Sequence, residues 1–187
     1  DFQLIQQGVP LVLSDTVGLA VWGNDNDTIR QTFTDDVQMI RRSSVNYALG
    51  EFRTSGAFET IRFRLGVPEP LQAAIPGLAP ENHPLRIQPE RLWLGRDTGY
   101  AALKLVFTRD TLTATPADTI WLARPDFGGL DFQQDGPFAH ESGFDFTLRL
   151  TADYKTLFQG VDLSTGDKSV WKQQIIVNLP QFLRVTP

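Results

Sequence analysis

The sequence predicts an all-β fold, an antiparallel β-sandwich with a long proline-rich capping loop. Two segments, residues 59–65 and 144–150, alternate strictly between apolar and polar side chains, as a strand with one buried face does. Clusters of glycine, proline, asparagine and aspartate separate short apolar runs at regular intervals. Apolar residues at the spacing of three and four that marks a helix are almost absent.

The remaining elements follow from the same reading of the chain. Further strands are expected at residues 2–5, 10–13, 17–22, 28–33, 37–40, 45–49, 101–108, 119–123 and 173–179. Residues 24–27, all asparagine or aspartate, predict a turn, and residues 125–137 predict a loop. Residues 154–158 fit either a strand or a short helix, and Pro180 can open a last helical turn.

The proline-rich segment, residues 66–100, is the longest stretch without a predicted strand. It holds six of the chain's 12 prolines together with His83 and Trp93. Connections in compact domains are usually about 4–6 residues long, and much longer ones are often functional. Its many leucine and isoleucine residues predict a packed loop over one end of the β-core rather than a solvated linker.

Length and composition favour one domain and exclude several kinds of partner. The 187 residues suffice for a single β-sandwich domain, residues 1–187, whose N-terminal strand and leader we expect to be missing from this chain. The formal net charge of −5 predicts no nucleic-acid partner. The chain contains no run of 18 apolar residues, so no membrane span is predicted. The absence of cysteine excludes disulfides and thiolate metal sites.

Recognised catalytic motifs are absent, so we do not expect an enzyme. The chain has no phosphate-binding glycine loop, no His-Glu-x-x-His pair and no nucleophile elbow. The two histidines, His83 and His140, are each predicted in a loop beside a core strand and near a carboxylate. Two imidazoles from distant loops would make a plausible mononuclear metal site, although histidines are more often surface or core residues. The four tryptophans are expected to fill the core or an interface.

The order of several short motifs resembles the MbnP-like family of bacterial periplasmic copper-binding proteins, related to MopE/CorA. The matching pieces are residues 63–68, 83–85, 93–100, 102–107, His140 ahead of 144–150, and 157–163. The resemblance implies a periplasmic or secreted β-sandwich that binds one copper ion through His83 and His140. It also implies Trp93 as an aromatic residue beside the metal, open to oxidation to kynurenine, and a di-haem cytochrome c peroxidase-like partner.

One departure from the family pattern concerns the tryptophans. Aligned on Gly99-Tyr100, Leu94 and Arg96 stand where the family often has tryptophan, and Trp93 is offset by one residue. In a strand, a one-residue offset turns a side chain to the opposite face, which disfavours kynurenine chemistry at Trp93.

Two functions therefore stay open. The first is a non-enzymatic copper-binding protein, which predicts uptake of about one equivalent of copper that is lost when both histidines are replaced. The second is a structural or protein-interaction β-sandwich of the same family that has lost the metal. It predicts imidazoles farther apart than the roughly 4 Å between two nitrogens that share one ion.

Overall fold

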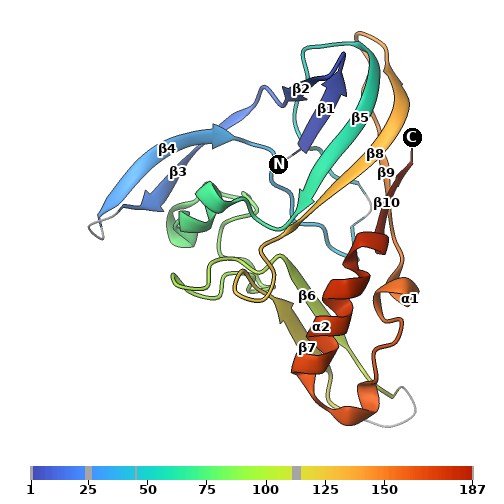
Figure 1. The fold of residues 1–187 in the computed structure, drawn as a ribbon. Helices are drawn as coiled ribbons and strands as arrows, with labels where there is room; N and C mark the ends of the chain where they lie inside the picture. Colours follow the sequence, from blue (N-terminus) through green and yellow to red (C-terminus); the bar gives the residue numbers. More distant parts are fainter. Residues whose placement is uncertain (1, 24–26, 45, 111–114, 187) are drawn as a thin grey trace.

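The computed structural model describes residues 2–23, 27–44, 46–110 and 115–186, and it is β-rich (Figure 1). Strands take up 36% of the chain and helices 16%, which confirms a predominantly β fold. All strand pairs are antiparallel, and the described strands do not close into a barrel. No helix in the described ranges is long and apolar enough to span a membrane.

The largest sheet has four strands, in the order β2–β1–β5–β8. They are β1 (Phe2–Gln6), β2 (Val9–Val12), β5 (Gly56–Leu65) and β8 (Leu130–His140). The predicted alternation of residues 59–65 is confirmed in β5. Ile61 lies in an apolar cluster on the inner face with Leu4, Phe58 and Phe138, while the arginines of β5 lie on the outer face. Val185 of β10 (Leu183–Thr186), which pairs with β9 (Arg149–Ala152), joins this cluster.

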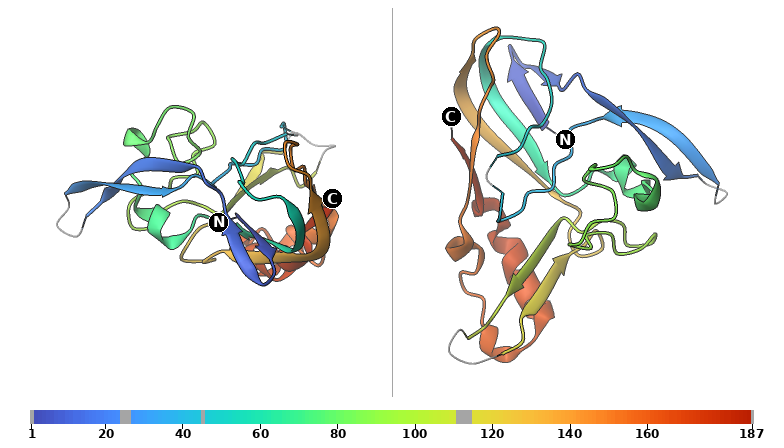
Figure 2. Two further views of the ribbon diagram at one scale, coloured as in Figure 1. Left: turned by 90° about the horizontal axis from the view of Figure 1, so that it is seen from above. Right: turned by 180° about the vertical axis from the view of Figure 1, so that it is seen from behind.

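A second part of the fold is a two-stranded ribbon that extends away from this sheet (Figures 1 and 2). It consists of β3 (Thr16–Trp22) and β4 (Thr28–Thr34), paired over seven residues. The proline-rich segment packs against β3 through the short 3₁₀ helices η1 (Glu69–Ala73) and η2 (Pro76–Leu78). The backbone N–H of Ile75 donates to Ala20 O at 2.8 Å, so this segment occupies part of the outer edge of β3.

The third part combines a short ribbon with the main helix. Strands β6 (Leu103–Phe107) and β7 (Asp118–Leu122) pack against α2 (Lys168–Asn178) around Trp171. Three short helices complete this part: α1 (Tyr154–Leu157), η3 (Leu163–Thr165) and η4 (Leu179–Gln181). Of residues 154–158, left open between strand and helix, residues 154–157 form α1, and Pro180 lies in η4 as expected.

For two segments the predicted secondary structure was wrong. Residues 173–179 lie mostly in α2, because Asp167 caps the helix by accepting from the backbone N–H of Ser169. Trp171, Ile175 and Leu179 then fall on one buried stripe at helical spacing. Residues 125–137 were predicted as a loop, but most of them belong to β8. Its pairing with β5 outweighs the low strand propensity of its glycine, aspartate and proline.

Other boundaries also differ from the prediction. Residues 37–40 and 46–49 form no strand, and residues 144–148 are irregular, with β9 beginning only at Arg149. Phe146 and Leu148 still reach the inner face of the large sheet, so their apolar pattern reflects burial rather than strand pairing. Residues 24–26 of the predicted turn, and residue 45, lie outside the described residues.

Candidate functional site

His83 is a buried part of the proline-rich segment. Its side chain is only 6% exposed, and its Nδ1 accepts a hydrogen bond from the backbone N–H of Leu85 at 3.2 Å. Because Nδ1 accepts, the neutral ring carries its proton on Nε2. Nε2 lies 3.5 Å from Asp35 Oδ1, within ion-pair distance but without hydrogen-bond geometry. The Nδ1 lone pair, which a metal ion would need, therefore already accepts the hydrogen bond from the backbone N–H of Leu85.

Burial also sets the charge of His83. Loss of hydration lowers the pKa of this imidazole below its ordinary value, and the nearby Asp35 carboxylate only partly opposes that shift. The ring is therefore neutral at pH 7 and is costly to protonate in the folded protein.

This shift makes the stability of the protein depend on pH. Between the lowered folded pKa and the unfolded value of about 6.5, the unfolded chain binds more protons. The free energy of unfolding should therefore be highest above about pH 6.5 and fall as the pH drops below it. Urea denaturation between pH 7.5 and 5.5 measures this slope, and His83→Gln should flatten it. Equal slopes for the two proteins would contradict this assignment.

Trp93 is linked to His83 through Tyr100 and Leu85. The rings of Trp93 and Tyr100 are 4.9 Å apart between centroids, and the two residues form an isolated β-bridge. The Tyr100 hydroxyl donates to Leu85 O at 2.6 Å, and burial raises its pKa. Since Leu85 also bonds His83, these groups form one packed unit that holds the segment together.

His140 lies elsewhere, as the last residue of β8 rather than in a loop. Its ring stacks on Phe58 and meets Phe146 edge-on. Nε2 lies 2.7 Å from Phe144 O and Nδ1 lies 3.4 Å from Thr54 O. A carbonyl oxygen only accepts, so both ring nitrogens face hydrogen-bond acceptors and neither is directed at another candidate ligand.

His140 lies at one end of the large sheet, and the residues beside His83 contact the other end. His140 pairs with Gly56 at the start of β5. Asp35 lies beside His83. The next residue, Asp36, accepts a hydrogen bond from the backbone N–H of Phe2. Phe2 pairs with Phe63, seven residues along β5, a strand length of roughly 23 Å.

No shared metal site is formed by these side chains as they stand. The strand length from Gly56, beside His140, to Phe63, near Asp35 and Asp36, far exceeds the roughly 4 Å across a shared ion. Within the described ranges, moreover, no group of three or more histidine, aspartate or glutamate side chains gathers as metal ligands do.

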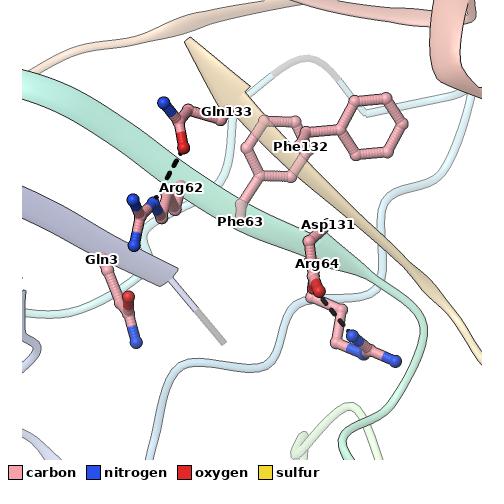
Figure 3. Close-up of a pocket in the computed structure, with 7 residues that line it drawn as sticks. All are labelled: Gln3, Arg62, Phe63, Arg64, Asp131, Phe132 and Gln133. Carbon is pink, nitrogen blue, oxygen red and sulfur yellow. Dashed lines mark hydrogen bonds and ion pairs between the residues drawn. The ribbon is translucent and has the colours of Figure 1, made fainter. Parts of the chain in front are cut away.

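The outer face of the large sheet carries a shallow depression of about 420 Å³ (Figure 3). Cross-strand pairs line it: Arg62 Nε donates to Gln133 Oε1 at 3.0 Å, and Arg64 Nη1 lies 2.7 Å from Asp131 Oδ1. Such exposed pairs are typical of a solvated sheet face, and each contributes little to stability. These polar groups bond to one another, so the depression has few polar groups available to bind a ligand.

The outer edge of β4 has backbone groups that are directed away from the rest of its ribbon. Asp35 N donates to Asp15 O, and Gly23 N donates to Asp27 O. Hydrogen-bonded pairs recur every second residue in an antiparallel ladder, so the odd-numbered residues of β4 bond to β3. The N–H and C=O groups of Thr28, Arg30, Thr32 and Thr34 therefore point away from β3. Among the described strands, only β3 pairs with β4.

This edge lacks the usual protection against pairing. Residues 28–32 are exposed, and β4 contains no proline, lysine or β-bulge. The sequence predicted the strand at residues 28–33 but not its position at an edge, because edge position depends on what packs beside the strand. The signal available in the sequence was a β-prone segment with one charge in seven residues.

Comparison of the chain with protein-family models, curated proteins and solved structures finds no match. The resemblance to the MbnP-like family therefore stays a prediction, as does its periplasmic or secreted location.

Proposed function

We propose that this chain is a non-enzymatic interaction domain that binds other proteins by accepting an extended strand at the outer edge of β4. The observation that carries the proposal is the row of four outward-directed backbone positions on β4, described above. Backbone hydrogen bonds supply affinity in this mode of binding, and pockets for alternate side chains supply specificity.

The surroundings of β4 support the proposal. The described residues form three two-stranded ribbons besides the four-stranded sheet. A two-stranded ribbon is marginally stable alone and gains from further strands or a packed face. The inner face of β3 has its cover in the proline-rich segment, whereas Ile29 on β4 is 38% exposed. An added strand would extend this ribbon and cover more of its apolar face.

The buried polar groups support a binding rather than a catalytic function. In the described part of the chain, the buried polar or charged residues are Gln72, His83 and Asp118. Gln72 and His83 bond to backbone groups of their own segment. Asp118 lies between Arg109 and Lys168, at 2.8 and 3.1 Å, and links β7 to the start of α2. All three are engaged with groups of the fold itself.

In this proposal the molecule is a β-sandwich whose second layer is only partly made of strands. The four-stranded sheet faces β10 and irregular segments, and residues 66–100 cap the β3–β4 ribbon. Copper, and with it the di-haem partner, stays a prediction of the resemblance. Binding copper through both histidines would require breaking the Leu85–His83 bond and closing the separation between them.

Selection from a displayed peptide library tests strand addition. We expect extended, alternating peptides that bind the wild-type protein and bind Thr32→Pro at least about 10-fold more weakly. Proline removes an outward N–H and blocks the edge, while the bonds from β4 to β3 use odd-numbered residues. Thr32→Ala keeps the N–H and should bind normally, and circular dichroism checks that each variant is folded.

Two results would overturn the proposal. One is a library that yields no binders; the other is a set of binders that Thr32→Pro leaves unaffected. The same wild-type protein, titrated with Cu(II) alongside a variant lacking both His83 and His140, tests the copper prediction separately. Uptake of one equivalent that depends on both histidines would favour copper binding over the present proposal.

A further inference from the structure

The order of polar and apolar residues in β4 is symmetric about Gln31. Reading outward from Gln31, Arg30 is matched by Thr32, Ile29 by Phe33, and Thr28 by Thr34. A strand with this order can lie antiparallel to a second copy of itself with Gln31 at the centre. Arg30 then faces a threonine rather than another arginine, and an aliphatic side chain faces an aromatic one.

The hydrogen-bond pattern of β4 fits this register. With Gln31 at the centre, Thr28 pairs with Thr34 of the second copy, and Arg30 pairs with Thr32. All of these are even-numbered residues, whose backbone groups point away from β3. Four such pairs, each exchanging two bonds, would form about eight hydrogen bonds across the edge.

Neighbouring registers are poorer. Centring the pair on Arg30 would place two arginines directly opposite each other, which is destabilising. Centring it on Thr32 would pair Thr28 with Asp36, beyond the end of β4, whose carboxylate already accepts from Phe2 N. The register about Gln31 alone keeps all seven residues of β4 paired.

Side-chain burial points the same way. Odd-numbered residues of β4 share a face with Leu19 and Val21, the buried face of β3. A two-fold axis through Gln31, perpendicular to the ribbon, leaves that face continuous across both copies. Exposed Ile29 then lies against Phe33 of the second copy, which gives an apolar contact on each side of the central Gln31 pair.

We infer that a second copy of this chain occupies the β4 edge, giving a two-fold symmetric dimer with a continuous four-stranded sheet, β3–β4–β4–β3. The inference rests on the proposed function, because both use strand addition at the same edge, and it names the partner. Peptides and other proteins would compete with self-pairing for this edge.

Cysteine cross-linking tests the register. The chain contains no cysteine, so single substitutions are unambiguous. Gln31 would face its own copy in a non-hydrogen-bonded pair with Cα atoms about 4.5 Å apart, within disulfide range. We expect Gln31→Cys to form a disulfide-linked dimer under mild oxidation. Arg30→Cys alone should cross-link poorly, whereas a mixture of Arg30→Cys and Thr32→Cys should form the mixed dimer.

Charge substitution tests the same contact without oxidation. Gln31→Lys and Gln31→Glu each place like charges at the centre, so each should weaken self-association about 10-fold or more. An equimolar mixture should restore the dimer. Sedimentation velocity from about 1 to 200 µM measures the populations. Gln31 is exposed although it pairs with Leu19, and circular dichroism checks that both variants fold.

The outcomes separate this inference from the proposed function. A wild-type protein that stays monomeric at 200 µM, together with equal cross-linking of Gln31→Cys and Arg30→Cys, would overturn self-pairing. If library peptides nevertheless bind in a Thr32→Pro-sensitive way, strand addition stands with another partner. If the dimer forms through Gln31 but no peptide binds, self-pairing stands and the binding of other proteins fails.

Discussion

Replacing Trp171 by alanine is expected to lower the free energy of unfolding by about 3–5 kcal/mol, as large-to-small changes of buried aromatics do. Trp171 is 1% exposed and packs with Leu157, Ile175 and Leu179. Its indole N–H donates to Asp162 O at 2.7 Å and to the hydroxyl of Thr165 at 3.2 Å. The substitution leaves a cavity and removes the tie between α2 and the loop before it.

Urea denaturation measures this effect, and the same helix supplies the control. Val177 is 69% exposed, so Val177→Ala should change the stability by no more than about 0.5 kcal/mol. Trp171→Phe keeps most of the ring volume but loses both hydrogen bonds, so it should fall between the two. A loss below about 1 kcal/mol for Trp171→Ala would mean that Trp171 does not fill this core.

Replacing Gln72 by leucine should cost about 2–4 kcal/mol, although it preserves side-chain volume. Gln72 is buried; its amide nitrogen donates to Val67 O at 2.9 Å and its amide oxygen accepts from Tyr100 N at 2.8 Å. Leucine leaves this carbonyl and this N–H without partners, at about 1–3 kcal/mol each. Gly99 keeps the space open, because a Cβ there would collide with the Gln72 amide, and its φ of +71° suits glycine.

Chemical denaturation of Gln72→Leu and Gln181→Leu makes a matched pair. Gln181 is exposed, so the same chemical change there should alter stability by no more than about 0.5 kcal/mol. Equal effects at the two positions would show that the Gln72 bonds do not hold the proline-rich segment in place. The result bears on function, since this segment covers the inner face of the β3–β4 ribbon.

Strands with one buried face could be predicted from the sequence, because their alternation is a local signal. Residues 59–65, found in β5, are the example. By contrast, β8 was missed because its residues have little strand propensity, and β5 supplies the pairing from far along the chain. The helix α2 was missed because its buried stripe shows only when Trp171 is counted with Ile175 and Leu179.

The candidate site was predictable only as a set of residue types. His83 and Trp93 were placed in one segment, and the structure links them through Tyr100 and Leu85. Whether His140 approaches His83 depends on how the large sheet orders its strands, which spacing does not reveal. The hydrogen bond from Leu85 to His83 is likewise a property of the folded turn rather than of the residue pattern.

The strand order of the large sheet also fixes when the protein can fold. Strand β5 pairs with β1 on one side and with β8 on the other, so its second edge must wait until residues 130–140 have been synthesised. Closing so long a loop is slow compared with forming local contacts. By then the nascent chain already contains β3 and β4, so this ribbon forms by local pairing before the large sheet is complete.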